Sequence, residues 1–130
     1  ATLIPPTEAI PRSLETPLGN NPRLIMHQLM DGEGLNLLAQ LYNTSTKAIT
    51  AVNYNLPQVL WVGTVIVIPL DTEDTSGLPS FIAYQVENDG TTIEELATSK
   101  GISLELLKKY NELPDGYVLT LGEWLLVPQQ

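Results

Sequence analysis

The chain has 130 residues, 43% of them hydrophobic, and carries six Lys and Arg against fifteen Asp and Glu, for a formal net charge of −9. That composition supports a folded core in one ordinary domain or two small ones and excludes a chain that is disordered overall. The acidic balance argues against nucleic acids and anionic membrane surfaces as partners, since both attract basic patches. The sequence contains no Cys, which excludes disulfides and thiolate sites, and no apolar run approaches the roughly 20 residues of a membrane-spanning helix.

The N-terminal segment, residues 1–22, contains five prolines. Proline fixes extended or polyproline-like backbone and cannot hold a helix, so we expect a linker or stalk. The alternative is an arm that lies along the folded part, since the segment also carries the apolar residues Leu3, Ile4, Ile10 and Leu14. The chain starts with Ala rather than Met and shows no signal peptide, so we interpret it as a processed or excised piece of a longer protein.

Residues 23–70 form the first of two segments of similar length, with weak signals for the order strand, helix, helix, strand. Its first helix is expected within GEGLNLLAQLY, which has no capping box, so the helix start there should be poorer. The acidic, turn-rich stretch that follows is expected to be a linker over residues 71–79. It lacks the ligand spacing and the closing Glu of a calcium loop, so a solvated linker is the better interpretation.

Residues 80–130 give clearer signals. The opening FIAYQV is rich in β-formers and alternates, which predicts a strand. TTIEELATSKG predicts a helix that Thr91 or Thr92 caps, with Glu94 or Glu95 completing a capping box and Gly101 ending the helix. ISLELLKKYN predicts a second helix, and EWLLV a second strand.

The two segments repeat each other. Equivalent positions lie at offsets of 57, 58 and 59 along the chain, which are seen at His27 and Tyr84, at Asn53 and Asn111, and at Gly63 and Gly122. The offset grows by one at each loop, as in structural repeats whose connections tolerate insertions. Both segments are therefore expected to share one β-α-α-β order.

Each unit resembles a LysM domain, a small module that binds polymers of N-acetylglucosamine (GlcNAc). The residues that carry the resemblance in the first unit are His27-Gln28-Leu29, Gly32 to Leu35, Leu38-Ala39, Asn53 and Gly63 through Pro69. In the second unit they are Tyr84-Gln85-Val86, Leu96-Ala97, Gly101, Asn111 and Gly122 through Pro128. The resemblance implies an α+β fold of two β-α-α-β modules, each a two-stranded antiparallel sheet covered on one face by two helices. The turn before the first helix departs from the family pattern in both units.

The resemblance also implies a shallow groove between two loops of each module. In module 1 (residues 23–70) the groove residues are Asp31, Gly32, Glu33, Gly34, Leu35, Leu56, Pro57, Gln58, Val59 and Leu60. In module 2 (residues 80–130) they are Asn88, Asp89, Gly90, Thr91, Thr92, Leu113, Pro114, Asp115, Gly116, Tyr117 and Val118. Trp61 and Tyr117 lie near the loop-to-strand joint, where each is placed either to stack on a sugar or to pack.

These features give two candidate functions. The first is non-catalytic binding of a GlcNAc-containing glycan by a secreted or cell-envelope protein of bacterial type. The second is a structural protein–protein module that keeps the fold without the groove. No catalytic residue, metal ligand or cofactor site is identified, and the one histidine, His27, is interpreted as a half-buried structural residue.

One further feature comes from strand alternation, which shows alternate residues to opposite faces of a sheet. The face away from the helices is apolar in both units, and its residues are Leu24, Met26, Val65, Val67, Phe81, Ala83, Trp124 and Leu126. Such a face must be covered. We expect the modules to pack against each other through these faces. The rival covers are the N-terminal arm and a second copy of the chain in a homodimer.

Overall fold

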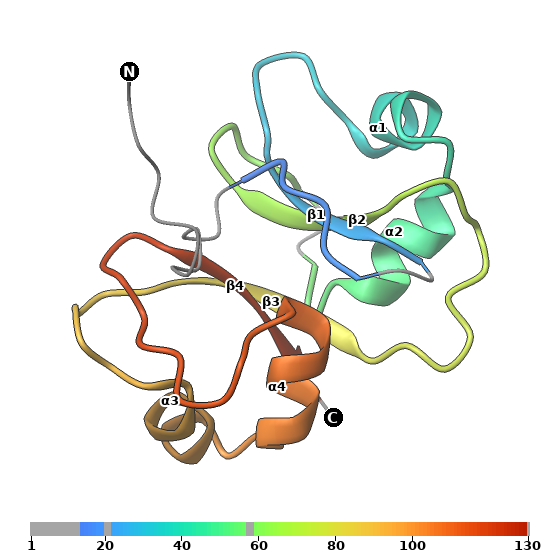
Figure 1. Cartoon of the computed structure of the whole chain (residues 1–130). Coiled ribbons are helices and arrows are strands. Elements are labelled where there is room, and N and C mark those ends of the chain that lie inside the picture. The colour runs from blue at the N-terminus through green and yellow to red at the C-terminus, as the bar shows by residue number, and fades with distance from the viewer. Residues whose placement is uncertain (1–13, 20–21, 57–58, 130) are drawn as a thin grey trace, which may run out of the picture.

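A computed structural model describes residues 14–19, 22–56 and 59–129. The elements are β1 (Leu24–Gln28), α1 (Leu35–Leu41), α2 (Thr46–Val52), β2 (Val65–Pro69), β3 (Ser80–Gln85), α3 (Ile93–Lys100), α4 (Leu104–Asn111) and β4 (Trp124–Gln129). β1 pairs antiparallel with β2, and β3 with β4, in two separate two-stranded sheets (Figure 1). The expected α+β fold with two β-α-α-β modules is confirmed.

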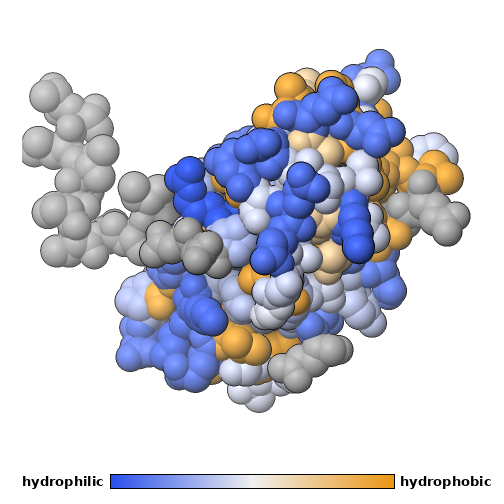
Figure 2. Space-filling view, turned by 90° about the vertical axis from the view of Figure 1, so that its right-hand side faces the viewer, coloured by the Kyte–Doolittle hydropathy of each residue, from blue (hydrophilic) through white to orange (hydrophobic). Residues whose placement is uncertain are grey.

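The surface is mostly polar on the face drawn in Figure 2, where hydrophilic side chains predominate and hydrophobic ones gather in separate areas. None of the helices in the described part of the chain is long and apolar enough to cross a membrane.

The helix starts differ between the modules. α1 begins after Gly34, which makes no side-chain cap, so the expected poorer start is confirmed. α3 begins with a capping box, in which the Thr92 hydroxyl accepts from Glu95 N–H (3.1 Å) and the Glu95 carboxylate accepts from Thr92 N–H (3.0 Å). Gly101 ends α3 in the left-handed conformation, with φ of 67°, as the sequence predicts.

An asparagine at the end of the second helix ties that helix to the last strand in both modules. Asn53 donates to the Val67 carbonyl (2.7 Å) and accepts from Val67 N–H (2.7 Å). Asn111 makes the same pair of bonds with Leu126, at 2.7 and 2.6 Å. Each amide also donates to a carbonyl one helical turn earlier, so its side chain is well satisfied inside the module.

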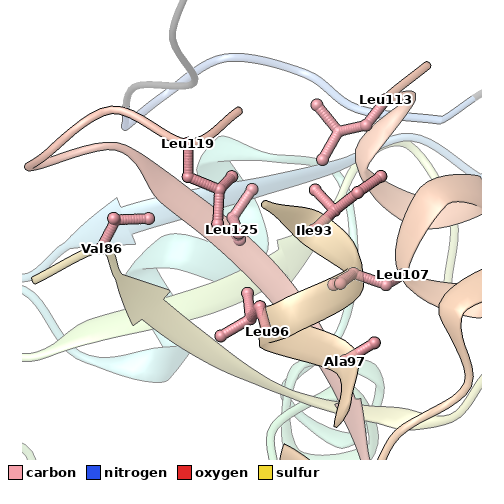
Figure 3. Close-up of a cluster of buried hydrophobic side chains, with 8 residues drawn as sticks. All are labelled: Val86, Ile93, Leu96, Ala97, Leu107, Leu113, Leu119 and Leu125. Carbon is pink, nitrogen blue, oxygen red and sulfur yellow. The ribbon is translucent and has the colours of Figure 1, made fainter. Parts of the chain in front are cut away.

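Each module has its own core between the helices and one face of its sheet. In module 1 the buried residues are Ile25, Leu29, Leu38, Ala39, Ile49, Ile66 and Ile68. In module 2 they are Val86, Ile93, Leu96, Ala97, Leu107, Leu113, Leu119 and Leu125 (Figure 3). Ile66 and Ile68 of β2 and Leu125 of β4 belong to these cores, so they lie on the helix-facing side of their sheets.

The opposite sheet faces meet in a third cluster, which we call the interface cluster. Its buried residues are Leu18, Leu24, Met26, Val52, Val67, Phe81 and Leu126, and Leu14, Val65, Leu78, Ala83, Tyr110 and Trp124 pack against it half-buried. All eight residues expected on the apolar faces belong to it. Phe81 is 1% exposed, and its ring meets Tyr110 edge-on at 5.0 Å between centroids.

Backbone contacts also join the modules. Tyr54, just after α2, donates its N–H to the Phe81 carbonyl of β3 (2.9 Å), and Asn53 forms a parallel bridge with Phe81. The two sheets thus cover each other within one chain. A homodimer through the same faces is not supported, because those faces are buried inside the monomer.

Residues 14–19 lie along the folded part as an arm. Leu18 pairs with Leu24 in an antiparallel bridge and is 3% exposed, and Glu15 N–H donates to the Met26 carbonyl (2.9 Å). At its end Gly19 N–H donates to the Glu112 carboxylate of module 2 (3.0 Å). The arm therefore contacts both modules. The apolar residues expected earlier in the arm, Leu3, Ile4 and Ile10, lie outside the described residues.

The shared cluster predicts that the modules unfold together. Phe81→Ala removes the fully buried aromatic ring of the cluster and should lower the free energy of unfolding by about 3–5 kcal/mol. Amide exchange should then accelerate in the cores of both modules, not only in module 2. Ile82→Ala is the matched control, because Ile82 lies next along β3 but is 40% exposed; about 1 kcal/mol is expected. Faster exchange in module 2 alone would contradict the shared core.

The capping box predicts a second, local effect. Thr92→Val keeps the side-chain volume but removes the hydroxyl that caps α3, so the free energy of unfolding should fall by about 1 kcal/mol. Thr91→Val, one residue earlier, is the control and should change it by no more than about 0.5 kcal/mol. Urea denaturation monitored by circular dichroism measures both. Equal losses for the two variants would show that the effect does not come from the cap.

Candidate functional site

The two predicted groove loops of module 2 lie side by side. Thr92 and Val118 form an antiparallel bridge. Gly90 N–H donates to the Leu119 carbonyl (3.1 Å), and Leu119 N–H donates to the Thr91 carbonyl (2.8 Å). Residues 90–92 and 117–119 are therefore joined by backbone hydrogen bonds, an arrangement that we call the ladder.

Acidic side chains hold the ends of this ladder. The Asp89 carboxylate accepts from Leu121 N–H (2.6 Å), and the Glu94 carboxylate accepts from Gly116 N–H (3.3 Å). Asp115 forms an ion pair with Lys108, which lowers the pKa of the Asp115 carboxyl. Two of these carboxylates thus bind backbone N–H groups, and the third binds a lysine.

Tyr117 packs rather than stands free. Its ring packs half-buried against the core of module 2, and its hydroxyl donates to the Glu123 carboxylate (2.6 Å). Glu123 is 2% exposed and also accepts from Thr120 N–H (3.0 Å). Val118, by contrast, is 53% exposed at the edge of the ladder. Sequence reasoning missed Glu123, whose only signal is a carboxylate directly before an apolar strand.

Both loops of module 1 pack on the core of that module. Leu35 from the first loop and Leu56 and Leu60 from the second pack half-buried against the same core. The predicted groove residues Pro57 and Gln58 lie outside the described residues. Val59 is 62% exposed and Trp61 is 70% exposed, so the indole has most of its surface in solvent.

A charged cluster adjoins the first loop of module 1. His27 is 7% exposed, and its Nε2 contacts the Glu33 carboxylate (2.8 Å) while Nδ1 contacts the Glu15 carboxylate of the arm. Glu33 also accepts from Met30 N–H (2.8 Å), and Tyr42 donates its hydroxyl to Glu15 (2.9 Å). His27 is therefore more buried than the sequence led us to expect, and it bridges two carboxylates.

These contacts shift three pKa values. Burial acts to lower the pKa of His27, but the hydrogen bonds to Glu33 and Glu15 outweigh it, so the pKa of His27 is raised. The hydrogen bond from His27, with that from the Met30 N–H, lowers the pKa of Glu33. Burial and the bond to Glu15 raise the pKa of Tyr42 to about 12.

Two other kinds of candidate site are a metal cluster and a surface hollow. Within residues 14–19, 22–56 and 59–129, no group of three or more His, Cys, Asp or Glu is placed to hold a metal ion. A shallow hollow lined partly by Leu78, Leu106 and Tyr110 lies between the linker and α4. Its lining includes no residue of either loop pair.

Solved structures provide remote matches. The spore cortex-lytic enzyme SleL of Bacillus cereus is 23% identical over 82% of this chain and 23% of that chain, with a TM-score of 0.34. SleL of Bacillus megaterium QM B1551 is 23% identical over 81% of this chain and 22% of that chain, with a TM-score of 0.40. The ectodomain of a receptor like kinase is 17% identical over 84% of this chain and 57% of that chain, with a TM-score of 0.34.

This chain thus spans less than a quarter of each SleL chain and little more than half of the ectodomain. No curated protein matches it by sequence. The family model for the LysM domain matches residues 31–69 and 80–128. Because these matches cover more than half of the chain and fall on both β-α-α-β units, the protein belongs to the LysM domain family as a tandem pair of modules.

Proposed function

We propose that the chain binds a GlcNAc-containing glycan, of the peptidoglycan or chitin-like class, without catalysing a reaction on it. LysM domains generally bind such glycans, and both modules keep the fold of the family. The observation that carries the proposal is the backbone ladder between the two loops of module 2, which gives this pair of loops a fixed shape before any ligand arrives.

The chemistry of the loops suits a neutral sugar polymer. A GlcNAc unit offers hydroxyls, an acetamide group and apolar faces, but no charge. Val118 offers exposed apolar surface at the ladder, opposite Thr92, and the adjoining loop carries polar side chains at Asn88 and Thr91. Because the GlcNAc unit is uncharged, the net charge of −9 does not oppose contact with it.

Module 1 offers a different surface for the same ligand. Trp61, at 70% exposed, presents an indole face, and sugars present apolar faces that suit aromatic rings. Since the modules pack against each other through the interface cluster, the two loop pairs are held at a fixed separation. A polymer long enough to reach both would bind with a gain from effective concentration.

A structural interaction module is the second candidate. It is favoured by exposed apolar side chains at one end of module 1, namely Met30 (65%), Val59 (62%), Trp61 (70%) and Val62 (67%). Such residues also suit a protein partner. Under either function we place the protein outside the cell or in the cell envelope, in a bacterium.

Titration with GlcNAc oligomers of increasing length tests the proposal. Amide shifts should concentrate in residues 88–92 and 113–118, with a second set beside Trp61, and the affinity should rise with oligomer length. Oligomer at up to about 10 mM covers the range of weak modules. If shifts were absent, or scattered over the surface, at that concentration, the result would favour the structural interaction module over glycan binding.

A matched pair of variants makes the test specific to module 2. Val118→Asp places a charge at the exposed edge of the ladder and should weaken binding there at least about tenfold, equivalent to 1.4 kcal/mol. Leu41→Asp is the control, because Leu41 is similarly exposed, at 62%, but lies in α1 of module 1, outside all the predicted loops. If both variants lost affinity equally, the ladder would not be the binding site.

A further inference from the structure

The arm formed by residues 14–19 is held to the modules by contacts of two kinds. Leu14 and Leu18 join the interface cluster, and Leu18 pairs with the edge of β1 at Leu24. The other contacts involve carboxylates: the Glu15 carboxylate binds the His27 ring and the Tyr42 hydroxyl, and the Glu112 carboxylate of module 2 accepts from Gly19 N–H. The contact of Glu15 with His27 depends on protonation of the ring, whereas the apolar contacts do not depend on protonation.

The charged cluster around His27 contains three further side chains. Glu15 comes from the arm, Glu33 from the loop before α1, and Tyr42 from the end of α1. The residue opposite His27 on β2 is Ile66, which carries no charge. The ring is thus placed between two carboxylates and one phenol hydroxyl.

Both contacts of the ring require a donor on the histidine side, since an ionised carboxylate only accepts hydrogen bonds. An imidazolium has two N–H donors, but a neutral imidazole has one donor and one acceptor. With His27 neutral, a lone pair on one ring nitrogen would face one of the two carboxylates. The arrangement seen in the structure is therefore that of the protonated ring.

The geometry also indicates which contact breaks when the proton leaves. Glu33 keeps its bond from Met30 N–H, so it stays in place and retains the N–H on Nε2. The Tyr42 hydroxyl lies 3.5 Å from Nδ1, so it is placed to turn from Glu15 to the exposed lone pair. Glu15, whose side chain is 48% exposed, would then lose both partners and turn to solvent.

We propose that Glu15, His27, Glu33 and Tyr42 form a pH-operated latch, which holds the N-terminal arm on the two modules while His27 is protonated and releases it when His27 is neutral. Release frees the edge of β1 that Leu18 now occupies and leaves its place in the interface cluster open. The latch goes beyond glycan binding and does not depend on it.

The direction of the pH effect follows from the pKa shifts. The pKa of His27 is raised in the folded state, so its stabilising contribution is complete below the ordinary value of 6.5 and is lost as pH rises through the folded value. The lowered pKa of Glu33 means that its contribution is lost only as pH falls through that lower value. Tyr42, with a pKa of about 12, remains a donor throughout.

Amide exchange and NMR shifts across about pH 5 to 9 test the latch, since histidine titrates in this range. After correction for the intrinsic pH dependence of exchange, protection of the Glu15 and Leu18 amides should fall at least about tenfold as His27 titrates. The core amides of module 2 should keep their protection. Arm protection that is unchanged at both ends of the range would overturn the proposal.

Glu15→Gln is the decisive variant, because its side chain is half exposed and its loss does not endanger folding. It should lower the midpoint of the His27 titration and weaken arm protection at low pH. Glu73→Gln makes the same change of charge in the exposed linker and should alter neither. His27→Gln should leave the arm equally protected at all pH values. If Glu15→Gln left both the midpoint and the arm protection unchanged, the latch would be disproved; no glycan enters either readout.

Discussion

The whole arrangement depends on burying the second face of each two-stranded sheet. Two helices cover only one face, so each module alone would expose an apolar surface that includes Phe81 or Met26. Modules of this size bury too little surface to tolerate such exposure. When the two apolar faces pack together, both are buried in one shared core. The hydrogen bond from Tyr54 N–H to the Phe81 carbonyl joins the modules at this point.

The two modules share the hydrogen bonds between the second helix and the last strand but differ in their loops. Asn53 and Asn111 make the same hydrogen bonds between helix and last strand, although the sequences around them differ widely. The loop before the first helix is built differently in each module. Module 2 uses a capping box at Thr92, whereas module 1 starts at Gly34 and engages Glu33 with His27 instead. The two loop pairs therefore offer different surfaces to a ligand.

The arm brings a carboxylate to the histidine of module 1. Its carboxylate, Glu15, meets the chain's one histidine, in a protein with a large acidic excess. The same arm reaches Glu112 of module 2 through Gly19. One short segment thus contacts both modules.

Local patterns in the sequence were enough to predict the β-α-α-β order, the weak start of α1, the cap of α3 and the apolar second face of each sheet. These features depend on the spacing of neighbouring residues, which strand alternation and helix capping translate directly into structure. The pairing of Glu15 with His27, the burial of Glu123 and the choice between stacking and packing for Tyr117 were not predictable in this way. The first forms only because the arm docks on module 1, and the other two depend on how the loop before β4 folds onto the core of module 2. A charge is buried only where the fold supplies it with a partner.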